Sequence, residues 1–83
     1  MISINLYPAW MHITIDTRHY LYSDDDIAFI YKCAAESEIT LSDLGISRDI
    51  YSFDTEPIEE PDKRGRLYEF LRLLTYSMII TVS

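Results

Sequence analysis

Alternation of apolar and polar residues marks two short segments at the start of the chain. The first apolar set is Ile2, Ile4 and Leu6, and the second, after an interruption at Pro8, is Met11, Ile13 and Ile15. A period of two residues is typical of a strand that buries one face. We therefore predict an antiparallel β-hairpin over residues 2–16, while residues 18–22 either extend its second strand or form a loop.

Two later segments repeat apolar residues with the period of a helix. The first set is Ile27, Ile30, Tyr31 and Ala34, and the second is Leu67, Phe70, Leu71, Leu74 and Met78. This spacing predicts amphipathic helices over about residues 24–37 and 62–76. Ser23 suits the N-cap of the first helix, and Asp24, Asp25 and Asp26 complement the dipole of its first turn.

The start of the second helix is less regular, because Lys63, Arg64 and Arg66 would oppose the helix dipole there. Either this helix begins near Arg66 or acidic neighbours offset the charge. The nearest acids in the sequence are Glu56, Glu59, Glu60 and Asp62, and we favour contact with them.

The remaining segments contain local stop and start signals. Thr40 followed by Asp43 imitates a capping box and Gly45 can end a helix, so we predict a single helical turn through Leu44. Ser47 then caps a second short segment that runs through Phe53. Residues 54–62 contain two prolines and five acids and are expected to form an exposed loop.

The last residues, 78–82, are rich in β-branched side chains, and we favour a third strand on the hairpin over an extension of the helix. The predicted fold class is therefore α+β, with an N-terminal β-hairpin packed against two main helices and a C-terminal third strand. A length of 83 residues allows one compact domain, covering residues 1–83.

Charge is distributed unevenly along the chain. The formal net charge is −7, but residues 24–62 contain twelve acids and two bases, whereas residues 63–83 carry an excess of three bases. Direct binding to nucleic acid needs a clustered Lys and Arg surface, which this composition excludes. The chain also lacks a basic leader followed by an apolar run, and its longest apolar stretch is too short to span a bilayer. We expect a soluble cytoplasmic protein without a membrane partner.

One segment resembles a known motif. The run Leu44-Gly45-Ile46-Ser47 is similar to the turn of helix-turn-helix domains, which implies DNA binding through the helix that follows. That helix would carry Asp49 and Asp54, which repel phosphates, and only Arg48 to attract them. We therefore set this interpretation aside.

Candidate chemistry is sparse, and we expect no enzyme, cofactor or metal. The single cysteine cannot form an intramolecular disulfide. Cys33 lies in the C-terminal half of its helix, where the dipole disfavours a thiolate, so we predict a core residue. His12 and Asp16 share one strand face, and His19 could fold back toward them, but the spacing does not match a zinc site.

We therefore expect a small acidic binding protein that inhibits or regulates a basic, nucleic-acid-handling protein, with acids standing in for phosphates. Phage or plasmid inhibitors, including anti-CRISPR and anti-restriction proteins, and immunity proteins share this size and charge. The candidate partner-binding residues are Asp24, Asp25, Asp26, Asp43, Asp49, Asp54, Glu56, Glu59, Glu60, Tyr20 and Tyr22. The alternative is a homodimeric regulatory or assembly component that associates through the apolar end of the second helix, formed by Leu73, Leu74, Met78, Ile79 and Ile80.

Overall fold

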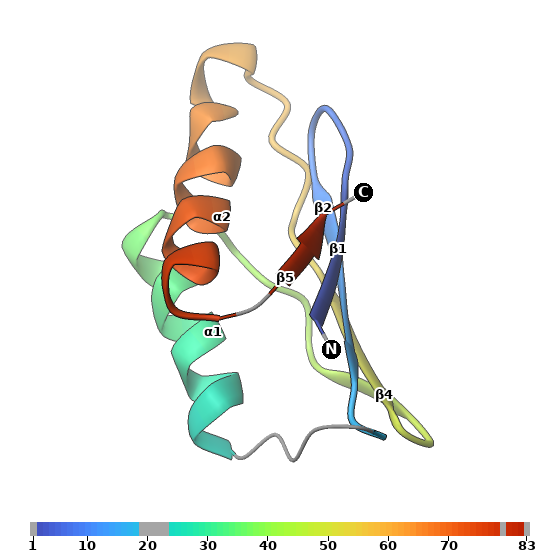
Figure 1. Ribbon diagram of the computed structural model, residues 1–83. Coiled ribbons are helices and arrows are strands. Elements are labelled where there is room, and N and C mark those ends of the chain that lie inside the picture. The colour runs from blue at the N-terminus through green and yellow to red at the C-terminus, as the bar shows by residue number, and fades with distance from the viewer. Residues whose placement is uncertain (1, 19–23, 79, 83) are drawn as a thin grey trace.

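A computed structural model shows a five-stranded sheet with two helices packed on one of its faces (Figure 1). It describes residues 2–18, 24–78 and 80–82. The elements in chain order are β1 (Ile2–Leu6), β2 (Met11–Asp16), α1 (Asp24–Glu36), β3 (Gly45–Ser47), β4 (Ile50–Asp54), a 3₁₀ turn η1 (Pro61–Lys63), α2 (Gly65–Ser77) and β5 (Ile80–Val82). The predicted α+β class is confirmed.

The N-terminal hairpin forms as the alternation predicts. Strands β1 and β2 pair antiparallel, with Ile2 opposite Ile15 and Ile4 opposite Ile13, and all four side chains are buried. At the turn, the amide of Tyr7 donates to the carbonyl oxygen of Trp10 at 2.9 Å. The rings of these two residues stack with their centroids 4.5 Å apart, which closes the turn without a glycine.

The hairpin lies at the centre of a mixed sheet with the strand order β3-β4-β2-β1-β5. Strand β5 pairs parallel to β1, with Ile80 opposite Ile2, which confirms the predicted C-terminal strand. Strand β4 pairs antiparallel to β2 and extends the sheet on the other side. The first and last described strands are therefore neighbours, as Figure 1 shows.

The prediction of two helical segments between residues 40 and 53 is wrong. Residues 45–54 form the β3–β4 hairpin instead, so the segment similar to a helix-turn-helix has no helix in it. Thr40 and Ser47 favour helix starts locally, but Tyr51 and Phe53 alternate with polar residues and fit a half-buried strand beside β2. The backbone amide and carbonyl groups of this segment therefore pair with neighbouring strands instead of within a helix.

Both long helices form within a few residues of the predicted bounds. Helix α1 begins at Asp24, and the predicted cap Ser23 lies outside the described residues. Helix α2 begins at Gly65, with Arg64 as its N-cap residue and Arg66 in its first turn, so these cations lie at the positive end of the helix dipole. The sequence allows two starts for this helix, near residue 62 and near Arg66, and the observed start at Gly65 agrees with the later one.

The core lies between the sheet and the two helices. The buried apolar residues are Ile2, Ile4, Met11, Ile13, Ile15, Ile30, Cys33, Ala34, Ile39, Phe53, Leu67, Phe70 and Leu74. The opposite face of the sheet is lined by the alternate, polar positions, which include Ser3, His12, Thr14, Ser52 and Asp54. Neither helix covers this polar face (Figure 1), and no helix in the described part of the chain is long and apolar enough to cross a membrane.

Candidate functional site

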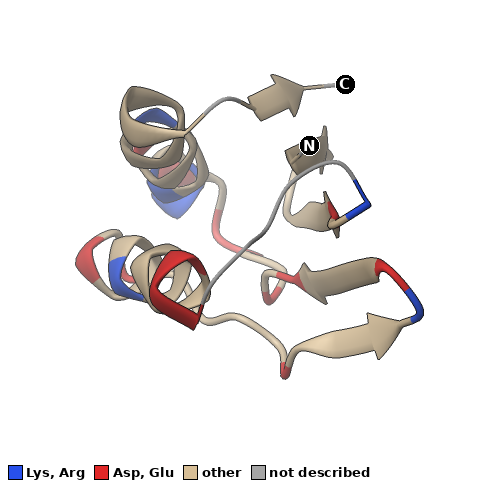
Figure 2. Ribbon diagram, turned by 60° about the horizontal axis from the view of Figure 1, so that its bottom comes forward, with Lys and Arg blue, Asp and Glu red and all other residues tan. Residues whose placement is uncertain are grey.

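Acidic residues are concentrated on one side of the molecule, formed by α1 and the β3–β4 hairpin, which we call the acidic half. Figure 2 shows acidic residues on α1 and along the β3–β4 hairpin, whereas basic residues gather on α2. The acidic half includes Asp24 and Asp25, in the first turn of α1, and Asp43 and Asp49, before and after β3 in the chain. All four residues are exposed.

Tyr31 holds these two acidic segments together. Its hydroxyl, on α1, donates to the carbonyl oxygen of Ser42 at 3.0 Å, and its ring lies 5.7 Å from the ring of Phe53 on β4. Ser42 in turn is bonded twice to Asp54: its amide donates to the Asp54 carbonyl oxygen at 2.8 Å, and its hydroxyl accepts from the Asp54 amide at 2.9 Å. Asp43 therefore has a fixed backbone beside β4.

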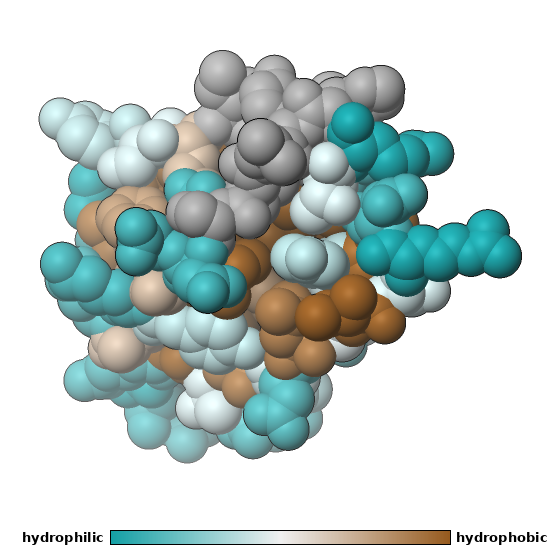
Figure 3. Space-filling model, turned by 90° about the horizontal axis from the view of Figure 1, so that it is seen from below, coloured by the Kyte–Doolittle hydropathy of each residue, from teal (hydrophilic) through white to brown (hydrophobic). Residues whose placement is uncertain are grey.

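An apolar residue is exposed within this acidic half. The side chain of Ile46, in β3, is 65% exposed although it projects from the helix-facing side of the sheet. Figure 3 shows the molecule from below, with brown apolar atoms in the middle of this end and hydrophilic side chains around them. An apolar centre with a charged rim is a common arrangement at protein–protein interfaces.

Other predicted site residues are partly neutralised within the fold. Glu60 accepts an ion pair from Lys63 at 3.0 Å, and Glu38, which was not predicted as a site residue, pairs with Arg66 at 2.9 Å. The expected contact between the basic triplet and the preceding acidic loop is therefore confirmed for Lys63 only. Arg64 instead donates from Nε to the carbonyl oxygen of Ile58 at 3.0 Å.

The remaining predicted residues are distributed over separate parts of the fold. Glu56 continues the edge of β4, where its amide donates to the Thr40 carbonyl oxygen at 2.9 Å. Glu59 is exposed on the connection to α2, away from the first turn of α1. Tyr20 and Tyr22 lie outside the described residues. The acidic segment of the sequence is consequently divided over separate parts of the fold.

A His–Asp pair on the open face of the sheet was not predicted. His12 Nδ1 lies 2.5 Å from an Asp54 carboxylate oxygen, across neighbouring positions of β2 and β4. The sequence contains the alternation that puts both side chains on one face, but the pairing depends on a register between segments 42 residues apart. The contact holds the Asp54 carboxylate toward β2, away from Asp43.

Candidate metal ligands are few in the sequence, and the structure shows where two of them lie. His12 and Asp16 do share one face of β2, as expected, while His19 lies outside the described residues. Among the residues that the structure describes, no three His, Cys, Asp or Glu side chains gather closely enough to hold a metal ion.

Cys33 is a core residue, as predicted. It is 3% exposed, and burial, followed by the nearby charge of Glu36, raises the pKa of its thiol; Lys32 acts in the opposite direction. A raised pKa disfavours the thiolate that a nucleophile or metal ligand requires.

Comparison of the chain with protein-family models, with curated proteins and with solved structures found no match.

Proposed function

We propose that this protein is a non-enzymatic binding protein that engages a basic, nucleic-acid-handling protein through its acidic half and restrains it. The observation that carries the proposal is the exposed Ile46 in β3, with the exposed Asp43 and Asp49 before and after it in the chain. The acidic rim would steer a basic partner and set the dependence on salt, and the apolar centre would slow its dissociation.

The distribution of ion pairs among the described residues supports this choice of surface. Asp24, Asp25, Asp43 and Asp49 form no ion pair with another described residue, whereas Glu38, Asp54 and Glu60 each have a partner within the fold. Unpaired carboxylates keep their charge available for a partner, and in this proposal they take the place of phosphates at its nucleic-acid site.

The alternative, a homodimer through the end of α2, loses the observation that favoured it. Leu74 is 1% exposed, and Leu73, Met78 and Ile80 pack against the core. Ile79 lies outside the described residues. Leu73, Leu74, Met78 and Ile80 pack into the domain, so the burial of these four described residues does not favour the homodimer. Sedimentation at micromolar concentration tests it directly.

The proposal is tested with immobilised protein and nuclease-treated bacterial lysate, at low and at high salt. We expect retention of a basic protein that binds nucleic acid and that loses this activity when the purified protein is added. Retention should fall sharply at high salt, because exposed charges are screened within about 3 Å at 1 M.

A matched pair of variants localises the contact. Asp24→Asn with Asp43→Asn removes two exposed charges of the acidic half that form no ion pair with another described residue, whereas Glu36→Gln with Asp62→Asn removes two exposed charges at other positions. Only the first pair should weaken retention, and Ile46→Ser should weaken it further by speeding dissociation. Equal loss in both pairs, or retention that is indifferent to salt, would contradict the proposal.

A further inference from the structure

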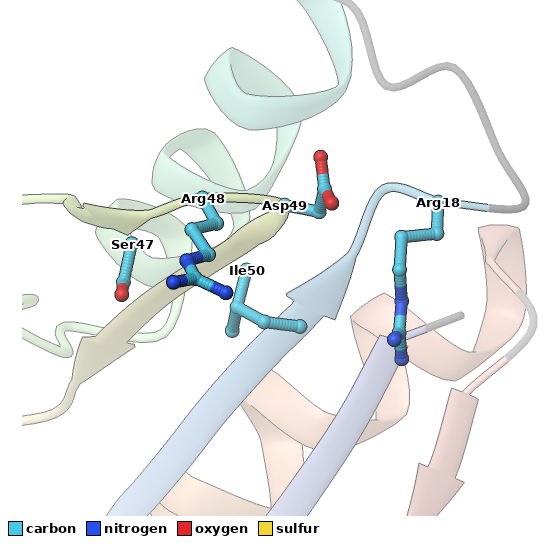
Figure 4. Close-up of a pocket in the computed structure, with 5 residues that line it drawn as sticks. All are labelled: Arg18, Ser47, Arg48, Asp49 and Ile50. Atoms are coloured by element: carbon cyan, nitrogen blue, oxygen red, sulfur yellow. The ribbon is translucent and has the colours of Figure 1, made fainter.

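A hollow at one end of the sheet combines two arginines from different parts of the chain. It has a volume of about 320 Å³ and lies where β2 ends and the β3–β4 loop turns. Its lining residues are Arg18, Ser47, Arg48, Asp49 and Ile50, which Figure 4 shows as sticks. The hollow therefore brings together two guanidinium groups, with Asp49 also among its lining residues, on the acidic half of a protein whose net charge is −7.

The strand register builds the floor of this hollow. Asp16 of β2 is opposite Ile50 of β4, and Ile50 is opposite Ser47 of β3, so the three residues form a row across the sheet. Because opposite residues in a sheet project to the same face, their side chains share the open face of the sheet. Ile50 supplies an apolar surface in the middle, and Ser47 a hydroxyl beside it.

Arg18 is held in place by Asp16. Its Nε lies 3.0 Å and its Nη2 2.6 Å from the two carboxylate oxygens, and its backbone amide donates to the same carboxylate at 3.0 Å. This fork uses the Nε side of the guanidinium, so the two N–H groups of Nη1 remain as donors. An arginine oriented in advance loses less rotamer freedom when it binds an anion.

Arg48 has a backbone conformation that is usually adopted by glycine. It is the first residue of the two-residue loop between β3 and β4, and its φ is 56°. Glycine is preferred where a tight hairpin loop needs a positive φ, and most other residues are disfavoured there. Arginine is thus present at a site where its backbone is unfavourable, which points to a role for the side chain.

The side chains at the loop are arranged for a ligand between the two arginines. Figure 4 shows the guanidiniums of Arg48 and Arg18 directed to the same side, with Ile50 between them and the carboxylate of Asp49 directed away. Arg48 is exposed and forms no ion pair within the described part of the chain. Planar guanidinium groups match the geometry of carboxylate and phosphate oxygens.

We propose that this hollow is a binding site for the oxyanion head group, phosphate or carboxylate, of a small ligand. The head group lies between Arg18 and Arg48 and accepts from the Ser47 hydroxyl, while the adjoining part of the ligand contacts Ile50. The site differs from the proposed protein-binding surface because it uses the guanidiniums of Arg18 and Arg48, although Asp49 borders both.

The test is a titration of the ¹⁵N-labelled protein with sodium phosphate and, separately, sodium acetate, with sodium chloride at equal ionic strength as reference. We expect the Nε–Hε signals of Arg18 and Arg48 to shift together and to saturate with one dissociation constant, while the signal of Arg72 does not. The anion that binds more tightly identifies the head group. Shifts that do not saturate, or that chloride reproduces, would overturn the proposal.

Variants of the loop complete the test. Arg48→Gly keeps a residue suited to the positive φ and removes the guanidinium, so affinity should fall about tenfold or more, as loss of a charge-assisted hydrogen bond implies. Arg48→Asn tolerates the same backbone and serves as a second variant. Lys32→Gln, an equal loss of charge on exposed α1 surface, should leave affinity within twofold. Unchanged affinity in both Arg48 variants would refute the site.

Discussion

The Thr55 hydroxyl makes a buried hydrogen bond whose removal has a predictable cost. Thr55 directly follows β4 and is 2% exposed, and its Oγ1 accepts from the amide of Met11 at 2.9 Å. The Thr55 amide donates back to the Met11 carbonyl oxygen at 3.0 Å. The side chain therefore takes the place of a backbone acceptor in the sheet.

Replacing Thr55 by valine keeps the branched shape and removes only the acceptor. Met11 is fully buried, so its amide would be left without a partner or access to water. An unsatisfied buried donor costs about 1–3 kcal/mol, which is a large share of the roughly 4–12 kcal/mol expected for a domain of this size. A loss of about 2 kcal/mol would lower the melting midpoint by roughly 8–16 °C.

The measurement is urea unfolding followed by circular dichroism, together with hydrogen exchange of the Met11 amide. Thr14→Val is the matched control, because it makes the same change on β2 where the hydroxyl has only a long contact of 3.5 Å with the Ser3 carbonyl oxygen. We expect the control to lose less than about 0.5 kcal/mol. Equal stability of the two variants, or full protection of the Met11 amide in Thr55→Val, would refute the reasoning.

Three further predictions concern the core, the β3–β4 loop and the thiol. Phe70→Ala, at a fully buried position of α2, should cost about 3–5 kcal/mol in urea unfolding, whereas Tyr76→Ala, at a side chain 87% exposed, should change stability little. Arg48→Gly should raise the free energy of unfolding by about 0.5–1 kcal/mol, because relief of the positive φ outweighs the entropy of glycine; a clear loss of stability would contradict this. Burial raises the pKa of the Cys33 thiol in the folded state, so the folded chain retains this proton longer and stability should fall as pH rises from the ordinary thiol pKa toward the raised one. Cys33→Ala should flatten this part of the pH profile, and identical profiles would show that the thiol does not contribute.

The elements that sequence patterns predict here are those with several repeats of one period. The β1–β2 hairpin and both helices each bury one regular set of side chains, such as Leu67, Phe70 and Leu74 on α2. Strand β3 has three exposed residues and therefore no period to detect. Its neighbours Thr40 and Ser47 favour helix starts locally, and only pairing with β4 decides between the two structures.

The candidate site was predictable in composition but not in arrangement. The excess of acids between residues 24 and 62 is evident from counting, yet Asp54 is turned toward His12 and Glu60 toward Lys63 by contacts that depend on the folded register. The exposed position of Ile46 could not be anticipated, because an isoleucine in a strand is ordinarily expected in the core. The hollow at Arg48 depends on a positive φ at that residue. Arginine seldom adopts a positive φ, so the sequence alone does not predict it.

The parallel pairing of β1 with β5 has a consequence for the order of folding. The β1–β2 hairpin joins residues close in sequence, whereas Ile2 meets Ile80 only after nearly the whole chain has been brought together. Distant pairings of this kind form late and slow the folding of small mixed domains. We expect β5 to be the last strand to dock and the first to detach, so its amides should exchange with solvent through local opening while those of β2 require global unfolding.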